Sequence, residues 1–423
     1  MKLQKILNRL QKLHPKEIDL SLSRIKKLCK KLGNPQKNLK LISVVGTNGK
    51  NSTIQTIRAI LTAAGIKSNI YTSPHIKKIN ERFVYNNKEI KDDELFKILC
   101  EVEEINNGDR ITYFEILTAA FFYGAKKYNK NINVIESGLF HRFDATNIIE
   151  KNLASIVTAI GLDHTDWLPY NERTVDKIIF EKTSKLLKSK IIVSNQPNKQ
   201  TLEKIKKSLN SNYSKKIFFN DLYTYSLGEN NFFYYEDEYG GLKLPMPNLI
   251  GGFQLSNISA AIATLRNIKE LNILDNHIKE GITKIKSIGR LQEIKSGKLK
   301  NIVKKNKLFV DGSHNPLGAK ALTDYLDTIH SNKHIIVGMM SNKEHQEYLN
   351  YFKYKINSIT TVDIPNQPNS IKGIDLKNKI TGFEKVNYKS SIEKALKSLK
   401  LQDGDIILIT GSLYLAGEFL NLN

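Results

Sequence analysis

The chain has 423 residues, 40% hydrophobic and 9% aromatic, with a formal net charge of +23 at pH 7. This length favours two domains over one, and no run of the sequence approaches the roughly 18 consecutive apolar residues of a membrane-spanning helix. The lysines are spread along the chain beside abundant asparagine and isoleucine. We therefore interpret the positive charge as a compositional bias and predict no nucleic-acid partner, with nucleic-acid binding as the alternative.

The N-terminal segment predicts an amphipathic helix and not a signal peptide, because charged residues interrupt every apolar stretch. One helical face carries Leu3, Ile6, Leu7, Leu10 and Leu13. The two cysteines, Cys29 and Cys100, have no metal-ligand spacing and imply no disulfide framework. These features predict a cytoplasmic protein.

Residues 41–53 are the most informative stretch of the chain. Residues 41–45 are mostly β-branched and apolar and predict a buried parallel strand, while residues 52–65 predict a helix. A turn at residues 46–49 joins them and leads into Lys50. Such a turn presents free backbone N–H groups at a helix N-terminus, so it predicts a nucleotide phosphate site. A Walker A loop has four residues between its first glycine and Gly-Lys, against two here, and a plain turn is the alternative.

Short apolar runs separated by helical patterns continue along the first two hundred residues, which predicts a parallel α/β sheet. The expected strands are residues 68–71, 132–135, 154–160 and 190–193. The expected helices include residues 92–107, with Asp92 as N-cap and Gly108 as the stop, and residues 174–188. Residues 217–244 predict an antiparallel meander rich in aromatic residues, and a helix follows over residues 255–271.

A second α/β set begins near residue 288. Its expected strands are residues 307–310, 334–340, 358–364 and 405–410. We place the boundary between residues 282 and 290 and predict two domains, 1–285 and 286–423. Ligands of open parallel sheets bind at the carboxyl ends of the strands. Because polar motifs lie there in both halves, the sequence predicts an active site in the cleft between the two domains.

Polar motifs follow three expected strands of the first domain. Ser73 lies in a Thr-Ser-Pro-His loop, Glu136 follows the next strand, and His164 lies in Gly-Leu-Asp-His-Thr-Asp. Carboxylate and imidazole groups beside a phosphate loop are candidate ligands of a divalent cation, and one carboxylate suffices where nucleotide phosphates bind Mg²⁺ as well. A surface turn at Ser73 and a local hydrogen bond of His164 are the alternatives. Spacing alone makes Lys182 a solvated helix lysine.

Further motifs lie after the meander and at strand ends of the second domain. Asn257 is near the start of the expected helix, and Arg290 lies at the hinge. Asp311 and His314 share the turn Asp-Gly-Ser-His-Asn-Pro, and Ser412 follows the last strand. Each motif is weak alone, and their common position at strand ends strengthens the prediction of a site.

Taken together, these motifs resemble the folylpolyglutamate synthase/dihydrofolate synthase family, of the bifunctional bacterial type, a branch of the Mur-ligase-like ATP-dependent amide ligases. The likeness covers nearly the whole chain. Residues 18–24, IDLSLSR, resemble the family's IDLGLxR; GTNGKNS resembles GTNGKGS, TSPH is identical, and DGSHNP resembles DGAHNP. The resemblance implies a two-domain Mur-ligase-like α/β fold. It has an N-terminal P-loop-type ATPase domain with the pterin or folate site and a smaller Rossmann-like domain for glutamate ligation.

The resemblance also implies a role for each candidate residue. The ATP contacts would be Gly49, Lys50, Asn51, Ser52, Asn257, Arg290 and Asp311. The ligands of two Mg²⁺ ions would be Ser73, Glu136, His164 and Lys182, the last as a carbamate. The pterin contacts would be Thr72, Phe143, Asp144 and Ala145. The contacts of the acyl phosphate or of glutamate would be His314 and Ser412. Four of these residues would be catalytic: Lys50, Lys182, His164 and His314.

The chain departs from the family's pattern in the loop after Glu136. Where the family commonly reads GLGGRLDATN, the chain has Phe140 and His141 in place of two glycines, which removes backbone freedom and adds bulk. After Lys182, Thr-Ser replaces the family's Ala-Gly, and Phe253 stands where a histidine is usual. No proposed metal ligand is lost, and the differences concern the shape of the pterin pocket.

We therefore predict a monomeric, ATP- and Mg²⁺-dependent ligase that joins L-glutamate to dihydropteroate and to reduced folates through an acyl phosphate. A monofunctional folylpolyglutamate synthase is the first alternative. A cell-wall amide ligase is the second, and the short segment before Gly46 disfavours it, because that branch would carry a uridine-nucleotide-binding domain there. A basic nucleic-acid-binding protein, with steeply salt-dependent binding, is the third.

Overall fold

The computed structural model describes residues 2–16, 19–229 and 231–423. Ile18, the first residue of the N-terminal motif, lies outside the described residues. The chain forms two compact units. Unit 1 consists of Met1–His164, Leu168–Asn248 and Leu255–Lys286, and unit 2 of Thr165–Trp167, Leu249–Gln254 and Ser287–Asn423.

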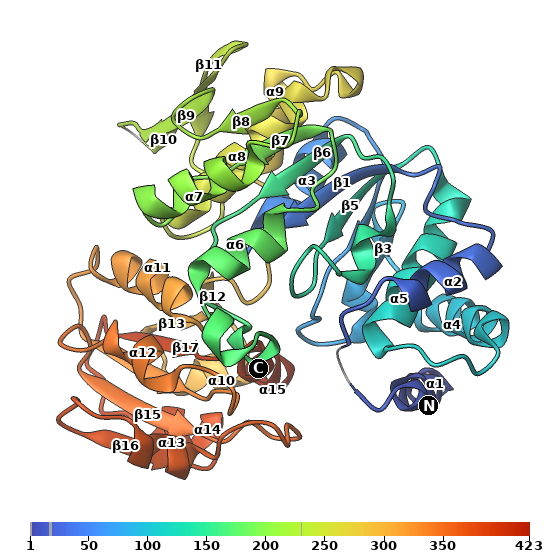
Figure 1. The fold of residues 1–423 in the computed structure, drawn as a ribbon. Helices are drawn as coiled ribbons and strands as arrows, with labels where there is room; N and C mark the ends of the chain where they lie inside the picture. The colour runs from blue at the N-terminus through green and yellow to red at the C-terminus, as the bar shows by residue number, and fades with distance from the viewer. Residues whose placement is uncertain (1, 17–18, 230) are drawn as a thin grey trace. The chain divides into compact units, whose positions relative to one another are not determined.

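Unit 1 is built on an eight-stranded sheet with the strand order β4-β3-β2-β5-β1-β6-β7-β8 (Figure 1). Its parallel strands are β1 (Lys40–Val45), β2 (Ser68–Tyr71), β5 (Ile132–Glu136), β6 (Ala154–Val157), β7 (Lys190–Val193) and β8 (Lys216–Phe218). The strands β3 (Phe83–Tyr85) and β4 (Lys88–Glu89) add an antiparallel edge. The continuous apolar runs that predicted the strands are buried, as expected when helices cover both faces of a parallel sheet.

Helices of unit 1 pack on this sheet and bury two apolar clusters. The helices are α1 (Lys2–Leu10), α2 (Ser23–Lys31), α3 (Lys50–Ala63), α4 (Asp92–Asn106), α5 (Tyr113–Ala125), α6 (Val175–Thr183), α7 (Lys199–Leu209) and α9 (Asp275–Ile282). Helix α8 (Phe253–Asn267) begins in a segment of unit 2 and continues in unit 1. One cluster joins α1, α2, α4 and α5, and the other joins α6 and α7 with β6 and β7. The expected N-terminal amphipathic helix is confirmed, with Ile6, Leu7 and Leu10 buried.

The predicted meander is confirmed over most of its length. The strands β9 (Tyr223–Leu227), β10 (Phe232–Asp237) and β11 (Gly240–Pro245) form a separate antiparallel sheet. The prediction is wrong for residues 217 and 218, which belong to β8 and pair in parallel with β7.

Unit 2 contains a six-stranded sheet with the order β12-β13-β17-β14-β15-β16. The strands are β12 (Gln292–Glu293), β13 (Lys307–Val310), β14 (Lys333–Val337), β15 (Ser358–Val362), β16 (Val386–Lys389) and β17 (Ile406–Thr410). All pairs are parallel except β12 with β13. The helices are α10 (Lys298–Ile302), α11 (Pro316–Leu326), α12 (His345–Asn350), α13 (Gly373–Lys379), α14 (Ile392–Ser398) and α15 (Leu413–Leu422).

Several predicted boundaries are wrong by a few residues. Asp92 is not the N-cap of α4: Lys91 holds that position, and the Asp92 carboxylate accepts a hydrogen bond from the Asn80 side chain. Helix α6 ends at Thr183, five residues before the predicted end at Lys188. The strands predicted at residues 154–160 and 334–340 end at Val157 and Val337, because the chain turns into the polar loops that follow.

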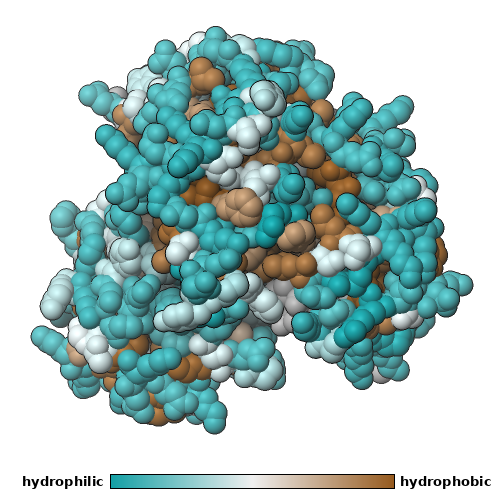
Figure 2. Space-filling model, viewed as in Figure 1, coloured by the Kyte–Doolittle hydropathy of each residue, from teal (hydrophilic) through white to brown (hydrophobic). Residues whose placement is uncertain are grey.

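No helix in the described ranges is long and apolar enough to span a membrane. Figure 2 shows mostly hydrophilic side chains on the displayed face, with hydrophobic side chains in small groups.

Candidate functional site

The glycine loop between β1 and α3 requires its glycines. Gly49 has φ +89°, and a Cβ there would lie 2.1 Å from Asn257 Oδ1. A Cβ at Gly46 would lie 1.9 Å from Thr158 Oγ1. The loop therefore packs so closely on its neighbours that only glycine is accommodated without a shift. The structure thus places Asn257 next to Gly49, and both are predicted site residues.

Lys50, Glu136 and Ser73 meet at the carboxyl ends of β1, β5 and β2. The Lys50 ammonium donates to the carbonyl oxygens of Gly46 and Thr47, both at 3.1 Å, and lies 3.9 Å from Glu136 Oε1. Ser73 N donates to Glu136 Oε2 at 3.1 Å. Glu136 is 4% exposed, so its charge lies in a region where interaction with a nearby cation is little screened.

Lys182 is buried, which excludes the solvated-lysine alternative. Its ammonium donates to Gly46 O at 3.0 Å and to Leu139 O at 2.8 Å, and it lies 5.6 Å from the centre of the Phe140 ring. Burial, and then the charge of Lys50, lowers the pKa of Lys182 to about 7. A substantial fraction of this amine is therefore uncharged at neutral pH.

The loop of residues 138–146 is held together by the carboxylate of Asp144. Asp144 Oδ2 accepts from Gly138 N at 2.9 Å and Leu139 N at 3.3 Å, while Oδ1 accepts from the backbone N and the hydroxyl of Thr146 at 3.0 and 2.6 Å. Burial raises the pKa of Asp144 despite these bonds. The Asp144 side chain was expected near the pterin; in the structure its carboxylate stabilises its own loop through these hydrogen bonds.

The same loop is fastened to α6 immediately before Lys182. His141 N and Arg142 N donate to Glu181 O at 3.0 and 2.9 Å. The Arg142 guanidinium forms a bidentate ion pair with the Glu181 carboxylate, at 2.8 and 2.6 Å. The Arg142 Cζ also lies 4.3 Å from the centre of the Phe143 ring, and Phe143 is 37% exposed.

The two residues that replace family glycines both point inward. Phe140 is buried in the apolar cluster beside α6. His141 is 2% exposed, and its Nδ1 lies 3.0 Å from Ser137 Oγ. Burial, and then the charge of Lys182, lowers the pKa of His141 to about 4. The extra bulk therefore fills the interior behind the loop.

His164 adopts a left-handed conformation with φ +58°. Its backbone N donates to Asp163 Oδ1 at 2.9 Å, and its Nε2 lies 3.8 Å from Asp163 Oδ2. The backbone bond leaves the role of the imidazole open between the metal ligand and the local contact that was the alternative. Asp163 is close enough to Lys182 to raise its pKa, against the larger effect of burial.

In unit 2, Asp311 binds two backbone groups. Its Oδ1 accepts from Ser313 N at 2.7 Å and its Oδ2 from Leu291 N at 2.6 Å. Burial raises the pKa of Asp311, and the Arg290 charge opposes that rise. His314 Nδ1 lies 2.9 Å from Gly312 O. Asp311, Arg290 and His314 are thus neighbours around one loop.

The remaining candidates have structural contacts of their own. Ser412 is 2% exposed and caps α15, its Oγ accepting from Tyr414 N at 3.1 Å. Thr72 N donates to Arg82 O at 3.3 Å. Ser52 and Ala145 are buried, at 3% and 4% exposure, and Asn51 is partly exposed in the first turn of α3.

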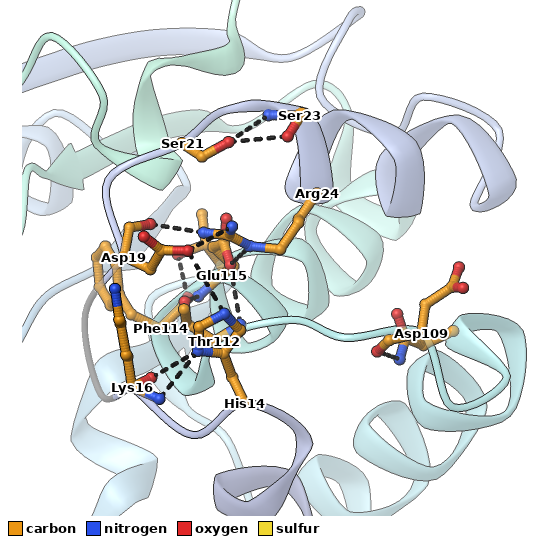
Figure 3. A network of polar contacts seen from close by, with 12 residues as sticks. His14, Lys16, Asp19, Ser21, Ser23, Arg24, Asp109, Thr112, Phe114 and Glu115 are labelled. Carbon is orange, nitrogen blue, oxygen red and sulfur yellow. Dashed lines mark hydrogen bonds and ion pairs between the residues drawn. The ribbon is translucent and has the colours of Figure 1, made fainter.

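A polar network around Arg24 was missed by the sequence analysis (Figure 3). Arg24 binds Asp19 Oδ2 at 2.7 Å and Glu115 Oε2 at 2.9 Å. The latter oxygen also accepts from Thr112 N at 2.8 Å, and Glu115 Oε1 is buried without a hydrogen-bond partner. The Thr112–Glu115 capping box is readable from the sequence and predicts the start of α5. The network anchors the N-terminal motif against α5.

The donor set is compatible with Mg²⁺ bound together with a nucleotide. Within the described ranges, no three His, Cys, Asp or Glu side chains form a group that could hold a metal by themselves. Mg²⁺ commonly uses one or two carboxylates and completes its octahedron with substrate phosphates and water. Buried Glu136, beside Ser73 and the phosphate loop, meets that requirement.

Comparisons with known proteins find similar sequences and structures over most of the chain. The Mur ligase, glutamate ligase domain family matches residues 289–413. The dihydrofolate synthase/folylpolyglutamate synthase of Escherichia coli is 29% identical over 342 residues, which is 80% of this chain and 76% of that protein. The structure of E. coli FolC in complex with DHPP and ADP is 26% identical, with a TM-score of 0.87 over 99% of this chain and 97% of that one. A bifunctional folylpolyglutamate synthase/dihydrofolate synthase with Mn, AMPPNP and L-glutamate bound is also 26% identical, with a TM-score of 0.86 over 99% and 97% of the two chains.

Proposed function

Because the chain belongs to the folylpolyglutamate synthase/dihydrofolate synthase family, we propose that it is an ATP- and Mg²⁺-dependent ligase that joins L-glutamate to dihydropteroate and to reduced folates. The observation that carries the proposal is the convergence of Lys50 and Lys182 on the carbonyl oxygen of Gly46, beside the buried Glu136. Lys50 supplies a cation for the phosphates, while Glu136 and, as a carbamate, Lys182 supply oxygen ligands for Mg²⁺. This set suits phosphoryl transfer to a carboxylate, where charge compensation is the main requirement.

The reaction has two steps. The acceptor carboxylate attacks the γ-phosphorus of ATP, so that an acyl phosphate forms and ADP leaves. The amine of glutamate then attacks the acyl carbon, an amide bond forms, phosphate leaves and the amine loses a proton. In the first step two oxyanions must approach, and cations nearby lower that Coulomb cost.

In this proposal the residues of unit 1 position the phosphates. The N–H groups at the start of α3 and Lys50 bind them, with Gly49, Asn51, Ser52 and Asn257 as the further contacts. Glu136 and Ser73 hold one Mg²⁺, which supplies Lewis-acid polarisation of the phosphoryl oxygens when it is bound. The tight packing of Gly49 on Asn257 supports a preformed loop.

Lys182 is proposed to be carbamoylated. An uncharged amine adds CO₂ to give a carbamate and releases one proton, which turns a cation into an oxygen ligand. The lowered pKa of Lys182 supports this step, since an ordinary lysine is almost fully protonated at pH 7. With His164, the carbamate is proposed to hold a second Mg²⁺.

The acceptor is proposed to bind near Thr72 and the turn of residues 143–145. The exposed ring of Phe143 provides an aromatic surface for a pterin. Asp144 contributes through the shape of the loop, since its carboxylate is occupied by backbone donors and Thr146. The anchored segment of residues 19–24 is a further part of this proposed site.

Residues 286–423 are proposed to form the glutamate-ligase domain and residues 1–285 the ATP-binding domain with the pterin or folate site. Arg290 and Asp311 are proposed ATP contacts, and their neighbouring positions around one loop support a joint role. His314 and Ser412 are proposed contacts of the acyl phosphate or of the incoming glutamate. We further propose that the protein is a cytoplasmic monomer that does not act on nucleic acid.

The test is ADP release by the purified protein with ATP, Mg²⁺ and L-glutamate, comparing dihydropteroate with tetrahydrofolate as acceptor. Release with both acceptors is the expected result. Release with tetrahydrofolate alone would identify a monofunctional folylpolyglutamate synthase, and release with dihydropteroate alone would identify a dihydrofolate synthase. Absence of release with both, in protein that binds ATP, would contradict the proposal and point to another Mur-type amide ligase.

A further inference from the structure

Three hydroxyl groups meet beneath the loop of residues 311–314 in unit 2. The Tyr348 hydroxyl lies 2.7 Å from Thr410 Oγ1 and 3.0 Å from Ser313 Oγ, and the last two atoms are 3.5 Å apart. Tyr348 and Thr410 are 0% and 1% exposed. Burial raises the pKa of Tyr348, so the phenol is uncharged and can donate a hydrogen bond. The cluster joins α12, the end of β17 and the loop after β13 (Figure 1).

Ser313 connects this cluster to two segments that carry proposed site residues. Its backbone N donates to Asp311 Oδ1 at 2.7 Å, and its carbonyl oxygen accepts from Gly411 N at 3.0 Å. Gly411 has φ +103°, and a Cβ there would lie 2.7 Å from Val337 Cγ2. The backbone at Gly411, just before Ser412, therefore has little room to move. A displacement of Ser313 would shift Gly411 through their hydrogen bond, and a displacement of Thr410 would shift it through the peptide bond, so either would change the position of Ser412.

We propose that the hydroxyl cluster of Ser313, Tyr348 and Thr410 positions Ser412 for the glutamate-dependent step, which makes these three positioning residues. This inference rests on the proposed function. In the motif that the chain resembles, alanine stands at the position of Ser313, so the serine hydroxyl is a feature of this chain.

We expect the cluster to affect Ser412, the proposed glutamate contact, more strongly than Asp311, the proposed ATP contact. Asp311 keeps its backbone donors, Leu291 N and Ser313 N, when the hydroxyl of Thr410 or Tyr348 is removed; the Ser313 side chain also bonds Asp311, so Thr410 gives the cleaner test. Thr410, in contrast, is two residues before Ser412 at the end of β17. Loss of the hydroxyl network therefore raises the KM for L-glutamate with little change in the KM for ATP.

The decisive pair of variants is Thr410→Val and Thr410→Ser. Valine keeps the shape of threonine and removes the hydroxyl, while serine keeps the hydroxyl. We expect Thr410→Val to raise the KM for L-glutamate about three- to tenfold, as for the loss of one hydrogen bond, with the KM for ATP within about twofold of wild type. Thr410→Ser is expected to retain the wild-type KM for L-glutamate.

Ser313→Ala and Tyr348→Phe probe the same network from its other two elements. Each is expected to raise the KM for L-glutamate, and the double variant is expected to raise it by less than the product of the two effects, because the residues share partners. Matched controls remove a hydroxyl elsewhere: Ser358→Ala, whose Oγ lies 2.8 Å from His334 Nδ1, and Tyr235→Phe, whose hydroxyl donates to Asp237 at 2.9 Å. Both controls are expected to leave the KM for L-glutamate unchanged.

Two results would overturn the inference in an enzyme whose wild type is active. One is a wild-type KM for L-glutamate in Thr410→Val, Ser313→Ala and Tyr348→Phe alike. The other is an equal rise in the KM for L-glutamate in Thr410→Val and Thr410→Ser, accompanied by an equal fall in the melting temperature of both variants. That result would show that the cluster has a purely structural role. A wild-type protein without glutamate-dependent ADP release would instead contradict the proposed function, and this inference with it.

Discussion

Lys50 and Lys182 donate hydrogen bonds to the same atom, the carbonyl oxygen of Gly46, at 3.1 and 3.0 Å. Lys50 comes from the first turn of α3 and Lys182 from the end of α6, so the shared acceptor links two elements far apart in the sequence. Their proximity explains why the charge of Lys50 adds to the effect of burial on the pKa of Lys182. The pairing also places both amines at the loop where phosphates are proposed to bind.

We predict that ligase activity depends on Lys182 as a carbamate. Lys182→Ala should lower kcat/KM by about 10²-fold or more, and short carboxylates should restore part of the activity by occupying the missing oxygen site. Lys182→Arg should be inactive and resist such restoration, because a guanidinium stays protonated and does not add CO₂. The measurement is ADP release with and without added acetate or propionate. Full activity of Lys182→Ala would refute the assignment.

The same residue predicts a pH dependence of activity. With the pKa of Lys182 at about 7, the amine is mostly uncharged above pH 7 and mostly protonated below it. We expect activity to fall as the pH drops below about 7 and added bicarbonate to offset part of that fall. The measurement is the pH–activity profile with and without added bicarbonate. Equal activities in the two profiles between about pH 6 and 7 would count against carbamate formation.

Gly49→Ala tests the tight packing of the phosphate loop. The new methyl group would meet Asn257 Oδ1 at 2.1 Å in a residue with φ +89°, so we expect ATP binding to weaken by at least about tenfold. Gly65→Ala is the matched control, because Gly65 has φ +72° with nothing within 4 Å of the added Cβ. It should cost about 1 kcal/mol of stability from backbone strain and leave ATP affinity unchanged. Calorimetric titration with a non-hydrolysable ATP analogue provides the comparison.

His141 should make unit 1 sensitive to acid. The folded-state pKa of His141, about 4, is below the ordinary value of 6.5, so its contribution to stability is present above pH 6.5 and is lost as the pH falls toward 4. Between pH 7 and pH 5 the loss should be about 2 kcal/mol. His141→Gln should flatten this part of the pH dependence of the melting temperature, whereas His330→Gln, at an exposed position, should not. Equal slopes in wild type and His141→Gln would disprove the prediction.

Glu136→Gln should shift the dependence on Mg²⁺. The amide keeps the size of the carboxylate and loses its charge, so we expect the Mg²⁺ concentration for half-maximal activity to rise by about tenfold or more. Glu150→Gln, at a side chain that is 71% exposed, is the control and should match wild type. Titration of activity with Mg²⁺ at saturating ATP distinguishes the two. An unchanged Mg²⁺ requirement in Glu136→Gln would remove Glu136 from the metal site.

The strands and glycine turns were predictable because their signals are local. The apolar run of residues 41–45 predicts the strand that the structure confirms as β1, and the glycine turn after it is recognised from adjacent residues in the same way. The state of Lys182 was not predictable from spacing, because its burial depends on Gly46 and Leu139, which are distant in sequence. The prediction that Asp92 is the N-cap of α4 was wrong for the same reason. The Asp92 carboxylate accepts a hydrogen bond from the Asn80 side chain, and this tertiary contact cannot be predicted from the residues next to Asp92. The network of Arg24 and Glu115 likewise joins α2 and α5, and these two residues are 91 positions apart in the sequence.

The loop of residues 138–146 has a consequence for how such a protein can diversify. Its Asp144 carboxylate fixes the turn that presents Phe143, while the N–H groups of His141 and Arg142 fasten the same loop to the peptide directly before Lys182. In the proposed function, a sequence change that reshapes this loop for a different acceptor also alters the hydrogen bonds that hold the peptide before Lys182. The proposed acceptor contact and the position of the proposed carbamate lysine therefore depend on one short segment, and we expect replacements in it to be tolerated best in combinations that keep its bonds to Glu181.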